Sequence, residues 1–113
     1  MVARKREPDA DALPLLAGLR VVEVALLAPN QLGMHLADLG ADVIKVEEPG
    51  RGDYTRAVGG THRGGVSMLH VRWNRGKRSI AIDLRSERGA AVFRELVAAT
   101  TPRAEAVPRG ALG

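Results

Sequence analysis

The chain has 113 residues, enough for one small domain, and a formal net charge of +4 at pH 7. It has no cysteine, which excludes disulfides, thiol catalysis and zinc–thiolate sites. No apolar run approaches the roughly 20 residues that span a bilayer, and the charged start MVARKREPDADALP lacks the apolar core of a secretory signal. We therefore expect a cytoplasmic protein with no membrane segment.

The first half of the chain predicts two buried strands after a disordered lead-in over residues 1–14. Residues 19–28, LRVVEVALLA, are an apolar and β-branched run with one interior charge, which is typical of a buried strand in a parallel sheet. Residues 42–47, DVIKVE, predict the second strand. A helix between them would complete a right-handed βαβ unit.

The helix between these strands has start, face and stop signals. Pro29 suits the first turn of a helix, because it needs no backbone N–H donor there. Leu32, Leu36 and Leu39 recur at helical spacing and predict the buried face. Gly40 stands where a left-handed C-terminal cap belongs.

The second half predicts a long loop and a third strand. Residues 48–66 are rich in glycine and predict a functional or flexible loop. Residues 66–73, VSMLHVRW, fit either a short helix or a strand. Residues 77–84, KRSIAIDL, alternate polar and apolar side chains and predict a strand.

A further helix should follow. Ser86 can cap its N-terminus, and the helix should end near Thr100. Its apolar stripe comprises Phe93, Leu96 and Val97. Residues 101–113 show no periodicity, and Pro108 interrupts any strand there, so we expect an irregular tail where an α/β pattern should supply another strand.

Two segments could bind an anion. The turn formed by Ala28, Pro29 and Asn30 would place helix N-terminal N–H groups at the tip of the first strand, which suits phosphate, although most such turns are plain connections. Residues 74–79, NRGKRS, gather three cations around a glycine. They suit a pyrophosphate or ribose phosphate, or else form a solvated basic turn.

Other polar residues give weaker signals. His35, His62 and His70 do not have metal-ligand spacing, so we expect no metal site. Glu23 and Glu47 lie within or at the ends of predicted strands. A buried carboxylate there can be functional, but a structural carboxylate with a charged partner is more common.

Three segments, LAGLRVVEVA, HLADLGADVIKVEEPGRGDYTR and NRGKRSIAIDLRS, occur together in this order. Residues 16–99, which contain them, resemble the N-terminus of family III CoA-transferases, the family of formyl-CoA transferase, carnitine CoA-transferase and α-methylacyl-CoA racemase. The resemblance implies an α/β fold with a Rossmann-like parallel sheet and flanking helices, here the incomplete N-terminal part of a larger domain over residues 15–100.

The resemblance also implies the chemistry. Family members act on CoA thioesters without a metal, and full-length members form interlocked homodimers. The transferases pass CoA between carboxylic acids through a catalytic aspartate, and the racemases move an α-proton. The implied CoA-binding positions here are Ala28, Pro29, Asn74, Lys77, Arg78, Ile82, Asp83, Leu84 and Arg85.

The chain departs from the family pattern at several positions. Glu48 replaces an arginine that contacts CoA in formyl-CoA transferase, and the loop after the first strand is one residue shorter. Ala106 and Val107 stand where the family has Asn and Phe. The implied catalytic residues would fall beyond position 113, so no catalytic residue is assigned in this chain.

We therefore expect a fragment from a frameshifted, split or truncated gene. It should be inactive alone. Because its sheet is incomplete, we also expect weak stability, aggregation or dependence on a complementing chain. A racemase-type fragment and a non-catalytic CoA- or nucleotide-binding module are the alternatives. A nucleic-acid-binding protein is not favoured, because the arginines are scattered and aromatic residues are few.

Overall fold

The computed structural model describes residues 14–26, 29–60, 62–100 and 105–106. The predicted lead-in 1–14 thus lies, apart from Pro14, outside the described residues. The helices and strands, in chain order, are β1 (Arg20–Glu23), α1 (Asn30–Asp38), β2 (Asp42–Glu47), β3 (His62–Arg63), β4 (Val66–Ser67), α2 (Met68–Trp73), β5 (Arg78–Ala81), α3 (Glu87–Ala98) and β6 (Glu105–Ala106). Two 3₁₀ turns cover Pro14–Leu16 and Tyr54–Arg56.

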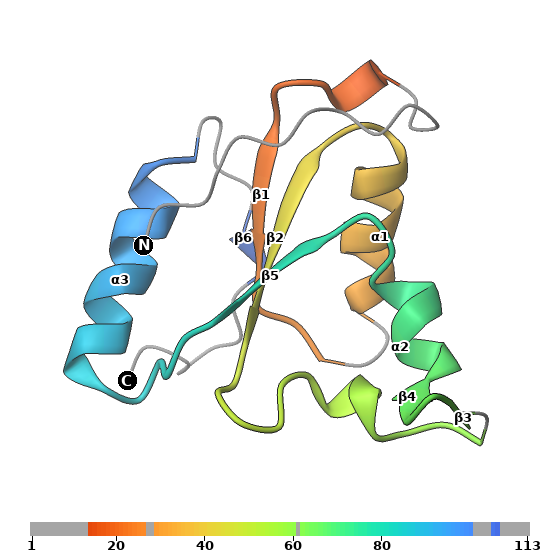
Figure 1. The fold of residues 1–113 in the computed structure, drawn as a ribbon. Coiled ribbons are helices and arrows are strands. Elements are labelled where there is room, and N and C mark those ends of the chain that lie inside the picture. Colours follow the sequence, from red (N-terminus) through yellow and green to blue (C-terminus); the bar gives the residue numbers. More distant parts are fainter. Residues whose placement is uncertain (1–13, 27–28, 61, 101–104, 107–113) are drawn as a thin grey trace.

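Four of the strands form one parallel sheet in the order β5-β2-β1-β6. Helices α1 and α2 lie on one face of this sheet, and α3 lies on the other (Figure 1). The strand order reverses between β1 and β6, as in a Rossmann-like sheet, so the carboxyl edge near β1 is a topological switch point. The predicted α/β class with a parallel sheet is confirmed.

Both faces of the sheet are covered (Figure 1), so a central strand is buried on both of its sides. In β2, every residue from Val43 to Glu47 is buried. Side chains alternate between faces along a strand. Val22 and Ile44 therefore pack with Phe93 of α3, whereas Val21 and Val43 pack on the α1 side.

Two predicted strands are shorter in the structure, and one segment with an open assignment is resolved. The strand predicted over 19–28 is regular only over Arg20–Glu23, since its register with β2 ends at the pair Glu23 and Lys45. The strand predicted over 77–84 is regular over Arg78–Ala81. The ambiguous segment 66–73 contains both structures, because β4 pairs with β3 and the chain then enters α2.

The buried face of α1 differs from the predicted one. Leu32 is 59% exposed, and the buried residues are Asn30, Gly33, Met34 and Ala37. The reason is that the first turn of α1 covers charged side chains of the sheet, described below, and needs polar or very small residues there. Gly40 has the predicted left-handed conformation, with φ of 99°.

The predictions for α3 are confirmed at its start and its face. The Ser86 hydroxyl accepts a hydrogen bond from the Gly89 N–H at 2.9 Å, and Phe93 and Leu96 are buried. In the predicted irregular tail, the structure describes only Glu105–Ala106, and this pair forms a short strand parallel to β1. No helix within the described residues is long and apolar enough to cross a membrane.

Candidate functional site

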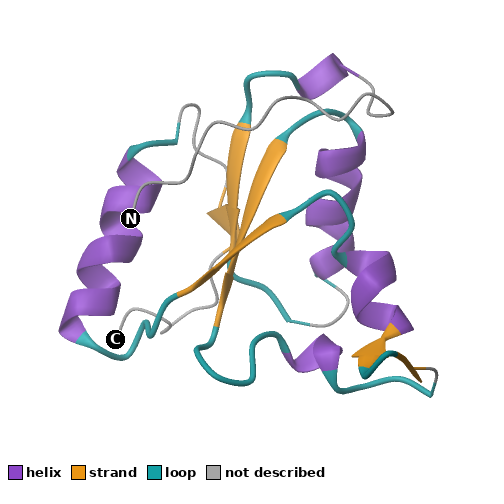
Figure 2. Ribbon diagram, viewed as in Figure 1, coloured by secondary structure: helices purple, strands orange, loops and turns teal. Residues whose placement is uncertain are grey.

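The segments that follow β1, β2 and β5 leave the sheet at its carboxyl edge (Figure 2). A groove lies between these segments. Its volume is about 700 Å³, which is within the range of small-molecule and cofactor sites. Three parts of the chain line it: residues 24–26 after β1, residues 46–49, 51–54 and 57 at the end of β2 and in the following loop, and residues 82–85 after β5. The position matches the switch-point rule for ligands of open α/β sheets.

The walls of the groove combine apolar and charged groups. Leu26 and Tyr54 are 58% and 57% exposed. They present apolar surface to the groove from two different loops. Arg51 and Arg85 are exposed on the same lining, and Arg51 lies 3.4 Å from Glu48 at the rim. The groove can therefore accept a ligand that is partly apolar and partly anionic.

The predicted CoA-binding residues separate into two sets in space. Ile82, Asp83, Leu84 and Arg85 all line the groove. Pro29 is exposed at the N-terminus of α1 and is not among the lining residues. Ala28 lies outside the described residues.

The cations of the basic turn, residues 74–79, are not among the residues that line the groove. Arg78 pairs with Asp42 through two contacts of 3.0 and 2.7 Å, at the amino end of the sheet, where β2 and β5 begin. Lys77 Nζ is buried among Glu23 Oε1 and Oε2, the Asn30 carbonyl and Asn74 Oδ1, all within 2.8–2.9 Å. The sequence NRGKRS predicted either a phosphate site or a solvated basic turn. Lys77 is instead a buried ion-pair partner of Glu23.

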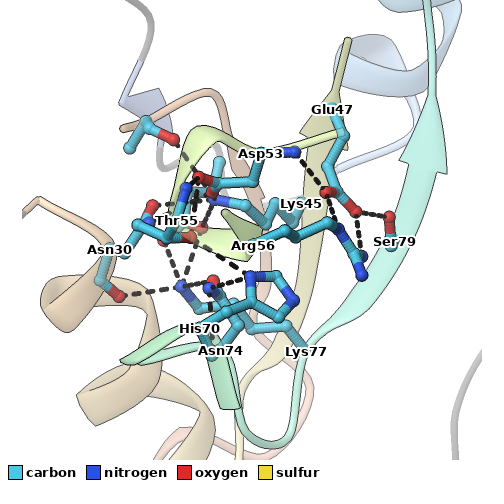
Figure 3. A network of polar contacts seen from close by, with 12 residues as sticks. Asn30, Lys45, Glu47, Asp53, Thr55, Arg56, His70, Asn74, Lys77 and Ser79 are labelled. Atoms are coloured by element: carbon cyan, nitrogen blue, oxygen red, sulfur yellow. Dashed lines mark hydrogen bonds and ion pairs between the residues drawn. The ribbon is translucent and has the colours of Figure 1, made fainter. Parts of the chain in front are cut away.

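A buried polar network extends from this lysine to the groove (Figure 3). Lys45 Nζ contacts Glu23 Oε2 at 3.1 Å, the Ala25 carbonyl at 3.2 Å, Asn30 Oδ1 at 2.7 Å and Asp53 Oδ2 at 2.5 Å. The Lys45 and Asp53 side chains are 2% and 0% exposed. Burial alone would raise the pKa of Asp53, but Lys45 and the Thr55 N–H and hydroxyl lower it.

His70 of α2 lies beside two residues of this network. Thr55 Oγ1 donates to Asp53 Oδ1 at 2.7 Å and lies 3.1 Å from His70 Nδ1. Asn74 Nδ2 lies 3.1 Å from the same nitrogen. Because the ammonium of Lys77 binds Asn74 Oδ1, the amide N–H₂ faces His70, whose Nδ1 must accept. Burial, followed by the charge of Arg56, lowers the pKa of His70.

A second cluster anchors the loop after β2 to the end of that strand. Glu47 Oε1 accepts the Asp53 N–H at 2.7 Å and Arg56 Nε at 2.8 Å. Its Oε2 accepts from Arg56 Nη2 at 2.9 Å and from the Ser79 hydroxyl. Burial would raise the pKa of Glu47, but these donors lower it to about 2. Glu47 is thus a structural carboxylate with one charged partner, Arg56.

The sequence shows Glu23 as a charge inside an apolar run, but it does not show which residue is its partner. The available signal was a second interior charge, Lys45, in the next predicted strand. In the parallel register these two residues are direct neighbours. The groove residues Arg51 and Tyr54 gave no signal beyond their place in a glycine-rich loop. Among the described residues, no group of three His, Cys, Asp or Glu side chains is arranged to hold a metal.

Comparison with known proteins assigns the chain to a family. Residues 16–101 match CoA-transferase family III. The chain belongs to this family. The chain is 40% identical over 93 residues to mouse succinyl-CoA:glutarate CoA-transferase, an alignment that covers 81% of this chain and 21% of that protein.

Two further similarities broaden the comparison. A 2-methylfumaryl-CoA isomerase of Chloroflexus aurantiacus is 46% identical over 90 residues, with 75% of this chain and 21% of that protein covered. The crystal structure of a CaiB/BaiF family protein from Brucella suis superposes with a TM-score of 0.70 at 45% identity, covering 83% of this chain and 26% of that one. The chain therefore spans about a fifth of the length of the curated relatives named here.

Proposed function

We propose that this chain forms the N-terminal, CoA-binding part of a family III CoA-transferase that acts on acyl-CoA thioesters and passes CoA between carboxylic acids. The observation that carries the proposal is the groove at the switch point of the sheet, lined by Ile82–Arg85 and by the loop after β2. Family membership supplies the ligand class, and the groove supplies a place for it.

The chemistry of the groove suits a nucleotide of this kind. Arg85 and Arg51 offer guanidinium donors for phosphate oxygens. Leu26, Tyr54 and Leu84 offer apolar surface for an adenine ring or a pantetheine chain. We assign Ile82, Asp83, Leu84 and Arg85 as the main CoA contacts, whereas Asn74 and Lys77 contribute indirectly, through the buried network.

The proposal assigns CoA binding, and no catalytic residue, to this chain. The catalytic aspartate implied by the family is expected beyond Gly113, so CoA binding and acyl transfer are separate properties in this proposal. The relative that transfers CoA from succinyl-CoA to glutarate makes short dicarboxylic acids the first substrates to test with a complete polypeptide.

A second function has its own support. The 46% identity to a 2-methylfumaryl-CoA isomerase shows that this region also occurs in an enzyme named for isomerisation. An isomerase or racemase of CoA thioesters is therefore the alternative, and a non-catalytic CoA-binding module is the third candidate. Sequencing the DNA downstream of the Gly113 codon separates them, because a continuing family pattern would carry either the transferase aspartate or the racemase residues.

Titration calorimetry with CoA tests the binding proposal directly. We expect binding by the 113-residue chain, and an affinity reduced about tenfold or more in Arg85→Ala, since a hydrogen bond to a charged group contributes about 1.5–3 kcal/mol. Arg94→Ala is the matched control, because Arg94 is an exposed arginine of α3 outside the groove lining. Absence of CoA binding by the folded chain, or equal losses in both variants, would refute the proposal.

A further inference from the structure

The ammonium of Lys45 is bonded to residues on two sides of the groove. One of its contacts is the carbonyl of Ala25, in the segment after β1, and another is the carboxylate of Asp53, in the loop after β2. Ala25 and Asp53 both belong to the groove lining. The ammonium therefore bonds at the same time to two walls that are far apart in the sequence.

The pair has no capacity left for a ligand. Four oxygen atoms surround Lys45 Nζ, from Glu23, Ala25, Asn30 and Asp53. The Asp53 carboxylate accepts from Lys45, from the Asn30 amide, and from the N–H and hydroxyl of Thr55. A catalytic or phosphate-binding lysine would need a free donor directed at its ligand, and this one has all its donors engaged.

Stability alone does not explain why charges stand here. Two charged side chains that are 2% and 0% exposed have lost their hydration, and replacing such pairs with apolar residues is often neutral or stabilising. What an ion pair provides and an apolar contact does not is directional specificity. Asp53 is the residue whose side chain caps the Tyr54–Arg56 turn, through the Thr55 N–H at 2.7 Å.

We infer that Lys45 and Asp53 are positioning residues, whose buried ion pair holds the loop of residues 48–57 in place as one wall of the CoA groove. The inference rests on the proposed CoA site. The pair fixes Asp53, the capped turn then fixes Tyr54, and Tyr54 faces the groove. Thr55 of this loop also lies 3.1 Å from His70 Nδ1, and Asn74 links His70 to Lys77. This gives the basic turn of residues 74–79 an indirect role in binding.

The test compares three variants with the unchanged 113-residue chain. Asp53→Asn removes one charge of the pair and leaves Lys45 and Lys77 to share the single carboxylate of Glu23. Lys45→Met with Asp53→Asn removes both charges, so no charge of the pair stays buried alone. Asp38→Asn is the matched control, because Asp38 also loses an arginine pair, with Arg75, at a surface outside the groove lining. The measurements are the melting midpoint, the CoA dissociation constant and amide hydrogen exchange.

A positioning role predicts different outcomes for stability and binding. We expect the melting midpoint to fall in Asp53→Asn and to return most of the way in the double variant. The CoA affinity of the double variant should stay about tenfold below that of the unchanged chain. A tenfold loss corresponds to about a tenth of the molecules holding the loop in its binding-competent conformation. Amides of residues 52–56 should exchange about 100-fold faster in Asp53→Asn, with β2 little changed. Asp38→Asn should alter neither affinity nor these amides.

Other results would overturn the inference. If affinity recovers together with the midpoint in the double variant, the pair only stabilises the fold. If exchange rises equally throughout the sheet, the loop is not specifically held. Should the unchanged chain bind no CoA, the proposed function fails, but the exchange comparison still decides whether the pair orders the loop.

Discussion

Gly33 gives the sharpest test of the packing around the buried charges. A Cβ built at this position would lie 2.0 Å from Glu23 Oε1 and 2.9 Å from Lys77 Cε. Neither atom can move freely, because Glu23 and Lys77 are held by each other and by Lys45 and Asn30. Gly33→Ala should therefore displace the Glu23 carboxylate from its two lysines.

The expected magnitude follows from two opposing effects. Breaking a buried ion pair costs about 3–5 kcal/mol, whereas alanine favours the interior of a helix over glycine by about 1 kcal/mol. The net loss is then about 2–4 kcal/mol. This is a large part of the roughly 5–15 kcal/mol of an intact domain, and a larger part of the weak stability expected for an incomplete sheet. The melting midpoint should fall on the order of 10 °C or more.

Urea and thermal unfolding followed by circular dichroism measure this change. Gly60→Ala is the control, since a Cβ at Gly60 meets no atom within 4 Å and its backbone is not left-handed. The control should leave stability unchanged or raise it slightly, because alanine restricts the unfolded chain. If Gly33→Ala is as stable as the unchanged chain, then Glu23 does not pack against α1 as described and the argument fails.

Three further predictions follow from the groove and its network. Gly89→Ala would place a Cβ 1.8 Å from the Asp83 carbonyl oxygen. The free energy of unfolding measured in urea should fall by about 1–3 kcal/mol, and CoA binding measured by calorimetry should weaken. Unchanged binding would contradict the role assigned to residues 82–85. The pKa of Glu47 is lowered from 4.5 to about 2, so the folded chain binds a proton less readily than the unfolded chain. On the order of 2–3 kcal/mol of stability, present above pH 4.5, should therefore be lost as the pH falls toward 2, and Glu47→Gln should flatten this slope. Burial lowers the pKa of His70 from 6.5, so the free energy of unfolding should begin to fall as the pH drops below about 6.5. Unfolding measured across this pH range tests the assignment. If His70→Phe shows the same fall, the assignment is refuted.

Local signals in the sequence predicted the strands, helices and their ends. These signals act through neighbouring residues, so a single sequence can reveal them. They include the β-branched residues of β2, Gly40 after α1 and Ser86 before α3. The resemblance to the family added the segment 82–85, which the structure places in the groove.

Contacts between distant residues were decided only by the tertiary structure. Glu23 and Lys45 look like isolated charges in apolar runs until the parallel register sets them side by side. Lys77 looks like a free cation until residues 23, 30 and 74 surround it. The buried face of α1 was mispredicted for the same reason, since Asn30 and Gly33 lie where the helix covers those charges. Hydrophobic periodicity shows which residues avoid water, but the pairing of buried charges depends on which segments the fold brings together.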